Sequence, residues 1–145
     1  MEENKSKLKV LIIDDEDDVR ERIRNILQRR GHTVFTAGDG QEGLDILKKE
    51  EVDIVYCDIV MPNMDGIEFM KRVKEFNLKT EFIMVTGCST VDRCVESIEQ
   101  NACGYLIKPL NVEDILKNLS EAERRIEQKR EMLKRALSAK EQPQQ

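Results

Sequence analysis

Five short apolar runs rich in β-branched residues alternate along this chain with five segments whose apolar residues recur at helical spacing. Short runs of this kind are typical of buried strands, and apolar residues three and four positions apart are typical of one face of a helix. The predicted strands span Leu8–Ile13, Thr33–Ala37, Val52–Cys57, Glu81–Val85 and Gly104–Ile107. Strand-then-helix units in series predict an α/β fold, a doubly wound five-stranded parallel sheet with helices on both faces.

The predicted helices follow each strand in turn. They run from Val19 to Leu27, Gln41 to Glu50, Ile67 to Val73, Val91 to Ile98, and from Val112 to about Ala139. Gly31 is expected to end the first of them, because glycine is the usual residue just past a helix terminus. The last helix is unusually long.

Composition excludes several classes of protein. The 145 residues suffice for about one domain, and 24 basic against 29 acidic residues give a net charge of −5. Residues 1–110 carry 16 basic and 22 acidic residues, a net charge of −6, which argues against direct binding of nucleic acid. Neither an apolar export leader nor a membrane-length apolar run is seen, so we expect a cytoplasmic protein that does not enter the membrane. The four cysteines, 57, 88, 94 and 103, form no C-x-x-C pair and are expected to be apolar packing residues.

Polar side chains follow four of the predicted strands. Asp14, Asp15 and Glu16 follow the first strand, Asp58 the third, Thr86 the fourth and Lys108 the fifth. In a doubly wound sheet the carboxyl ends of the strands meet at one crevice. Carboxylates that converge repel unless a cation compensates, and oxygen ligands without His or Cys suit Mg²⁺. An aspartate beside a metal ion, a lysine and a hydroxyl predicts a phosphoryl acceptor.

Other sequence patterns fit different functions. Gly38-x-Gly40-x-x-Gly43 matches a nucleotide-binding pattern, but it follows the second strand, and the acids after the first strand would repel a pyrophosphate. A flavin binder is disfavoured by the absence of Trp. A Mg²⁺-dependent phosphohydrolase remains an alternative. His32 is expected at the surface.

The chain resembles the receiver domains of two-component response regulators. The resemblance covers roughly residues 8–119 and depends most on the segment from Asp58 to Gly66, with its Met61-Pro62 and Asp65-Gly66. The other matching segments are Ile12–Glu16, Ala37–Leu44, Met84–Gly87 and Gly104–Leu110.

The resemblance implies a role for each matched residue. Asp58 would be the phosphoacceptor. Asp15 would bind Mg²⁺ directly, Asp14 mainly through water, and the backbone carbonyl of Val60 would be a further ligand beside Asp58.

The remaining matched residues would act on the phosphoryl group. Thr86 and Lys108 would bind it, Tyr105 would follow Thr86 as a switch, and the Lys108–Pro109 bond would be cis. Gly43 stands where the family more often has Ala, which would weaken that helix slightly. Cys88 and Val60, both apolar, would tune water access to the acyl phosphate.

The resemblance also implies partners. The phosphoryl group would come from a sensor histidine kinase or a phosphotransfer protein. The output would be a downstream protein target or the chain's own output domain. The chain would catalyse only its own phosphorylation and dephosphorylation and would turn over no external metabolite.

Because the last helix continues past the region of resemblance, we expect three parts in the chain. They are a receiver domain at 8–122, a helical extension at 123–140 and a disordered tail at 141–145. The extension is expected to be a linker or a coiled coil, and in the second case a parallel homodimer would bury Leu119, Ile126 and Leu133. Charged pairs are expected at Glu113–Lys117, Glu121–Arg125 and Glu131–Arg135. The predicted seam steps by four and three along Ile115, Leu119, Ala122, Ile126, Lys129, Leu133 and Ala136.

Overall fold

A computed structural model describes residues 7–87, 95–96 and 98–141 of the chain. Its elements alternate between strand and helix as predicted, and the predicted start of the fourth helix lies outside the described residues. The elements are β1 Lys9–Ile13, α1 Asp17–Arg29, β2 Thr33–Ala37, α2 Gly40–Lys49, β3 Ile54–Asp58, α3 Gly66–Phe76, β4 Glu81–Thr86, β5 Gly104–Ile107 and α5 Val112–Glu141. The turns between β4 and β5 include helical residues at 95–96 and 98–101.

The sheet is entirely parallel, with strand order β2-β1-β3-β4-β5. The predicted fold class is therefore confirmed. The chain adds β2 on one side of β1 and β3 on the other, so β1 and β3 flank the point where the winding reverses. Ligands of such sheets bind beyond the carboxyl ends of the strands at this point, which is where Asp14 and Asp58 lie.

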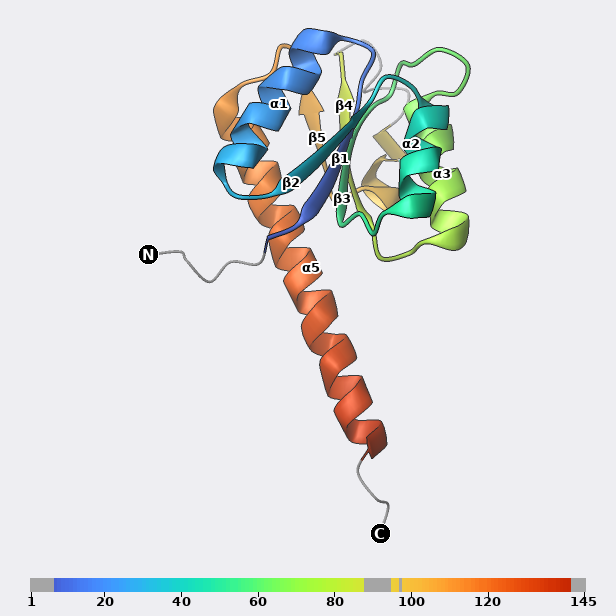
Figure 1. Ribbon diagram of the computed structural model, residues 1–145, viewed down its shortest axis with the longest axis vertical. Coiled ribbons are helices and arrows are strands. Elements are labelled where there is room, and N and C mark those ends of the chain that lie inside the picture. The colour runs from blue at the N-terminus through green and yellow to red at the C-terminus, as the bar shows by residue number, and fades with distance from the viewer. Residues whose placement is uncertain (1–6, 88–94, 97, 142–145) are drawn as a thin grey trace.

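Two apolar layers cover the sheet, because side chains of successive strand residues point to opposite faces. Leu11 and Ile13 belong to the layer beneath α2 and α3. Val10 and Ile12 belong to the layer beneath α1 and α5, and Figure 1 shows these two helices side by side. Cys57 is fully buried, as the apolar interpretation of the cysteines predicts.

Polar side chains and a glycine mark the helix ends. The carboxylate of Asp39 accepts a hydrogen bond from the Glu42 amide at 2.9 Å, and Asp65 accepts one from the Glu68 amide at 2.8 Å, so each caps the helix that follows it. Gly31 follows α1 with a φ of 90°, the left-handed conformation that favours glycine at this position.

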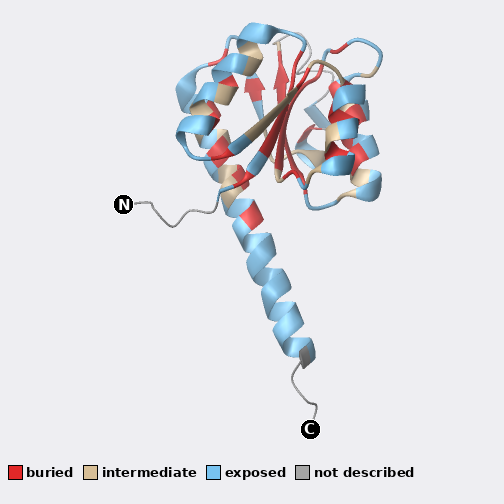
Figure 2. Cartoon of the chain, in the orientation of Figure 1, coloured by how far each residue is buried: buried red, intermediate tan, exposed pale blue. Residues whose placement is uncertain are grey.

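The helix α5 packs on the sheet with residues that the sequence analysis assigned to a dimer seam. Ile115, Leu119, Ala122 and Ile126 are buried in the apolar layer of their own chain. The prediction that a parallel homodimer buries Leu119 and Ile126 is wrong, because both side chains are already buried against their own chain. Ile126 is the last buried residue of α5, and the side chains from Glu127 to Lys140 are exposed (Figure 2).

Ion pairs hold α5 at the edge of the sheet where the strands begin. Arg125 and Lys129 both contact Glu81, the first residue of β4. Arg130 lies 3.2 Å from Asp53, which precedes β3. The expected Glu121–Arg125 pair is wrong, because Arg125 reaches Glu81 and Glu121 pairs with Arg124 instead. Glu131 and Arg135 lie 3.7 Å apart.

His32 is buried, so its expected surface position is wrong. Its Nδ1 accepts a hydrogen bond from the Leu8 amide at 3.0 Å, and its Nε2 lies 3.0 Å from the Glu123 carboxylate. An Nδ1 that accepts a hydrogen bond leaves the proton on Nε2, which donates to Glu123. His32 thus joins the start of β1 to α5.

The helices of the described part of the chain include none with an apolar stretch of the length that a membrane span requires.

Candidate phosphoryl-acceptor site

The carboxyl ends of three strands place Asp14, Asp58 and Lys108 next to one another. Asp14 follows β1, Asp58 ends β3 and Lys108 follows β5. The ammonium nitrogen of Lys108 lies 3.2 Å from Asp58 Oδ2 and 3.3 Å from Asp14 Oδ2. Lys108 also pairs with Glu16. One cation therefore serves three carboxylates, and the Lys108–Pro109 peptide bond that follows it is cis.

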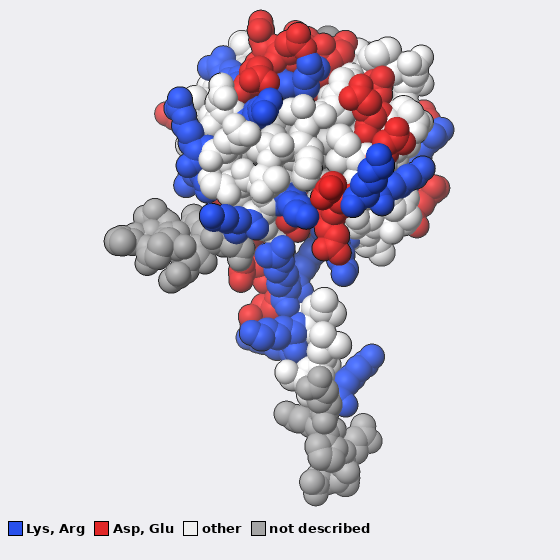
Figure 3. Space-filling view, viewed as in Figure 1, with Lys and Arg blue, Asp and Glu red and all other residues white. Residues whose placement is uncertain are grey.

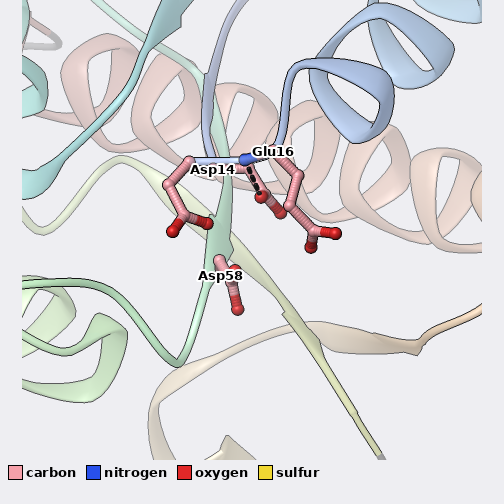
Figure 4. A group of neighbouring side chains, drawn as sticks. Asp14, Glu16 and Asp58 are labelled. Carbon is pink, nitrogen blue, oxygen red and sulfur yellow. Dashed lines mark hydrogen bonds between the residues drawn. The ribbon is translucent and has the colours of Figure 1, made fainter.

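The acidic cluster consists of Asp14, Asp15, Glu16 and Asp58, whose carboxylate oxygens lie within 4.8 Å of one another. Figure 4 shows Asp14 and Glu16 above Asp58, with the Glu16 amide donating to Asp14 at 2.9 Å. Asp14 and Asp58 are buried, whereas Asp15 and Glu16 are exposed.

One oxygen of the cluster lacks a hydrogen bond. Asp14 Oδ2 is buried and has no hydrogen-bond partner among the described residues, although Lys108 is near. A buried carboxylate oxygen is costly unless hydrogen-bonded or bound to a cation. The atoms of the described residues that could bind a metal here are all carboxylate oxygens, which are the ligands that Mg²⁺ prefers. The residues present therefore fit a magnesium ion.

Burial and charge crowding shift the acidities of the site. Burial is the main cause that raises the pKa of Asp14 to about 6, and the neighbouring Asp58 carboxylate adds to it. Burial likewise raises the pKa of Asp58, opposed by Lys108. Burial lowers the pKa of Lys108, but its contacts with Glu16, Asp58 and Asp14 outweigh this, so that its pKa is raised overall. The site holds more negative charge than its single lysine neutralises.

The loop after β3 folds tightly against Asp58. The Val60 amide donates to Asp58 Oδ1 at 3.1 Å, and the Gly66 amide donates to the Ile59 carbonyl at 2.7 Å. A β-carbon at position 66 would collide with the carbonyl oxygen of Asp58, which explains why the Asp65-Gly66 pair belongs to this segment. The Val60 side chain points to solvent and is 59% exposed.

Thr86 and Tyr105 lie on the two strands beyond β3. Thr86 is fully buried at the end of β4, and its hydroxyl donates to the Gly87 carbonyl at 3.1 Å. The Tyr105 side chain is 44% exposed on β5, beside a hollow of about 640 Å³ between β5 and α5. Cys88 and Cys94 lie outside the described residues.

Contacts of Glu16 and Gly43 were missed by sequence reasoning. Glu16 was grouped with the acids after β1, but its ion pair with Lys108 joins residues 92 positions apart, for which the sequence holds no local signal. A β-carbon at Gly43 would lie 2.5 Å from Ile13 Cδ1 and 3.2 Å from the Phe69 ring. Packing therefore accounts for Gly43, which the nucleotide-binding alternative had assigned to a phosphate loop.

Comparisons with known proteins agree on one family. The family model of the response regulator receiver domain matches residues 10–120. Sporulation initiation phosphotransferase F of Bacillus subtilis (strain 168) is 35% identical over 107 residues, which cover 74% of this chain and 86% of that protein.

A longer regulator and a solved structure extend the comparison. The transcriptional regulatory protein ZraR of Klebsiella oxytoca is 36% identical over 113 residues, 78% of this chain but 26% of that protein, so the chain spans about a quarter of it. The crystal structure of the chemotaxis response regulator CheY4 of Vibrio cholerae has a TM-score of 0.71 and 34% identity, covering 81% of this chain and 99% of that chain.

Proposed function

Because this chain belongs to the response regulator receiver family, we propose that Asp58 accepts a phosphoryl group from the phosphohistidine of a sensor histidine kinase or phosphotransfer protein. The observation that carries this assignment is the buried Asp58 carboxylate 3.2 Å from Lys108 Nζ, beside the acids that follow β1. A carboxylate oxygen of Asp58 would form the new bond to phosphorus as the bond to the histidine nitrogen breaks.

Two neighbours of Asp58 prepare this step. The Val60 amide holds Asp58 Oδ1, which fixes the orientation of the carboxylate. Lys108 reaches Asp58 Oδ2 and carries a positive charge with which a transferred phosphoryl group would pair. Both groups are in place without rearrangement of the loop, so the site is preorganised for the charge that develops on transfer.

Asp14, Asp15, Asp58 and the Val60 carbonyl would hold Mg²⁺. Asp14 Oδ2 supports this assignment, because it is buried without a hydrogen bond and shares its neighbouring cation, Lys108, with Asp58 and Glu16. A bound ion supplies charge neutralisation for the crowded carboxylates and for the transferring group.

Thr86 and Tyr105 would transmit the modification. The Thr86 hydroxyl, which now donates to the Gly87 carbonyl, would exchange that acceptor for a phosphoryl oxygen. Such an exchange gives the phosphorylated state a contact that the free state lacks, as any coupled conformational change requires. The Tyr105 ring, half-exposed beside α5, would follow into the vacated space.

The output would be made through protein contacts. We propose that the chain modifies only itself and signals in the cytoplasm to a protein target or to an output domain of its own. Steady turnover of a phosphomonoester would instead indicate a phosphohydrolase.

The experiment that tests the assignment measures the mass of the intact protein after incubation with acetyl phosphate and Mg²⁺. One phosphoryl group is expected on the wild type and none on Asp58→Asn. Asp45→Asn, an exposed aspartate of α2, is the matched control and should be labelled like the wild type. Full labelling of Asp58→Asn would overturn the assignment.

A further inference from the structure

The Lys108 ammonium is already occupied by carboxylates before any phosphoryl group arrives. It donates hydrogen bonds to Glu16 and Asp58, and Asp14 Oδ2 lies 3.3 Å away. A lysine ammonium carries three N–H donors and a single positive charge. A phosphoryl group that pairs with Lys108 therefore competes with carboxylates that are held in the same place.

Glu16 is the carboxylate that Lys108 can release at the lowest cost. The side chains of Asp14 and Asp58 are 1% and 6% exposed, whereas that of Glu16 is 58% exposed. A buried carboxylate that loses its cation finds no water to replace it, which is costly. The Glu16 carboxylate can turn into solvent instead, so it is the partner whose place a phosphoryl oxygen takes.

The backbone keeps Glu16 within reach of Lys108 in either case. The Glu16 amide donates to Asp14 Oδ1 at 2.9 Å, and the Glu16 carbonyl accepts from the Arg20 amide at 3.2 Å. Glu16 is the N-cap residue of α1, but its side chain makes no capping hydrogen bond. Its carboxylate is therefore a tethered ligand of Lys108, present at a high effective concentration.

The surroundings of Glu16 add negative charge rather than neutralise it. Asp17 and Asp18 follow in the first turn of α1, and Figure 3 shows acidic side chains gathered over this end of the molecule. Like charges at short range disfavour one another. Removal of the Glu16 charge should therefore favour a bound phosphoryl group in two ways, by freeing Lys108 and by reducing repulsion.

We propose that Glu16 competes with the phosphoryl group for Lys108 and so limits the modification of Asp58. This inference rests on the function proposed for Asp58. In the free state the Glu16 carboxylate accepts a hydrogen bond from Lys108. In the modified state a phosphoryl oxygen accepts that bond, and the Glu16 carboxylate turns into water. The exchange changes only the hydrogen-bond acceptor, and no proton is transferred.

The test is a titration of the full chain with beryllofluoride, an anion that mimics a phosphoryl group, followed by fluorine NMR. Each variant is saturated with Mg²⁺ beforehand. Glu16→Gln keeps the side-chain length but removes the charge, and it should tighten binding about fivefold, equivalent to about 1 kcal/mol. A structural contact that is lost would weaken binding, so a gain in affinity distinguishes competition from a structural role.

Asp18→Asn is the matched control. Asp18 is exposed two residues beyond Glu16, and the same change in charge there should leave the affinity within about twofold. Equal tightening by Asp18→Asn and Glu16→Gln would overturn the inference, because net charge alone would then explain both.

Failure of this inference and failure of the proposed function give different results. Fluoride bound to the wild type but not to Asp58→Asn is expected, and it shows that the anion occupies the acceptor site. Absence of bound fluoride from the wild type, or its persistence in Asp58→Asn, would overturn the proposed function. Unchanged or weaker binding by Glu16→Gln, with the dependence on Asp58 intact, would overturn the competition alone.

Discussion

Asp14 concentrates the electrostatic cost of the site in one side chain. Its buried carboxylate lies beside Asp58 and shares Lys108 with two other acids. Asp14→Asn should remove repulsion while an amide oxygen keeps the bond to the Glu16 amide. We expect the metal-free variant to be more stable than the wild type by about 1–3 kcal/mol. Urea unfolding at neutral pH measures the difference.

Magnesium provides the control for this prediction. The ion should stabilise the wild type and should stabilise Asp14→Asn less, since the variant offers one charged ligand fewer. Asp45→Asn should behave like the wild type in both conditions. A metal-free Asp14→Asn protein that is less stable than the wild type would contradict the proposed charge crowding.

Gly43 shows how packing overrides helix propensity. Replacement of a glycine inside a helix by alanine ordinarily adds about 1 kcal/mol to the free energy of unfolding. At Gly43 the new β-carbon would lie 2.5 Å from Ile13 Cδ1, so Gly43→Ala should give no gain or a loss. Valine lacks that δ-carbon, so part of the gain should return when Gly43→Ala is made on an Ile13→Val background, and the Phe69 ring 3.2 Å away limits the rest. Equal effects on both backgrounds in thermal unfolding would contradict the packing argument.

Glu81 connects two elements of the fold, because this first residue of β4 forms ion pairs with Arg125 and Lys129 of α5. Burial opposes ionisation of Glu81, but Lys129 and Arg125 outweigh it and hold its pKa below the ordinary value of 4.5. A lowered folded-state pKa contributes stability that is present above the unfolded pKa and is lost as pH falls through the folded pKa.

Glu81→Gln should therefore lower the free energy of unfolding near pH 7 by about 1–2 kcal/mol, a modest value because both cations are partly exposed. The difference from wild type should begin to shrink as the pH falls below the ordinary value of 4.5 and should vanish only below the lowered folded-state pKa. Glu68→Gln removes an exposed pair with Arg72 and should cost at most about 0.5 kcal/mol. A pH-independent effect of Glu81→Gln in urea unfolding would show that lost packing, rather than charge, explains it.

The whole molecule consists of a body and an exposed helical end, the part of α5 that follows Arg130. Truncation can test the boundary between the two. Ending the chain after Arg130 removes side chains that are exposed throughout the part with described burial, residues 131–140, and should change the free energy of unfolding by at most about 0.5 kcal/mol. Ending it after Ser120 removes the buried Ile126 and the partners of His32 and Glu81. This second truncation should cost at least about 3 kcal/mol. Equal stabilities in urea would contradict the boundary.

Local sequence patterns predict most of this architecture, but they do not predict contacts between residues that are far apart in the chain. Short β-branched runs fix the strands to within about two residues, and the polar residues after them predict a common site because parallel strands end at one edge. The partners of His32 and Arg125 lie 91 and 44 residues away. Periodicity therefore identifies one face of α5 as apolar but cannot tell whether that face meets the sheet or a second copy.

Because α5 is one unbroken helix, the direction in which its last turn faces is set where the helix packs on the sheet. From Val112 beside the cis bond to Glu141, thirty residues form one helix, about 45 Å long. Anything attached to its last turn inherits an orientation defined at the sheet. Each inserted residue would rotate that attachment by about 100° and advance it by about 1.5 Å. Seven inserted residues would nearly restore its bearing, whereas two would turn it to the opposite side.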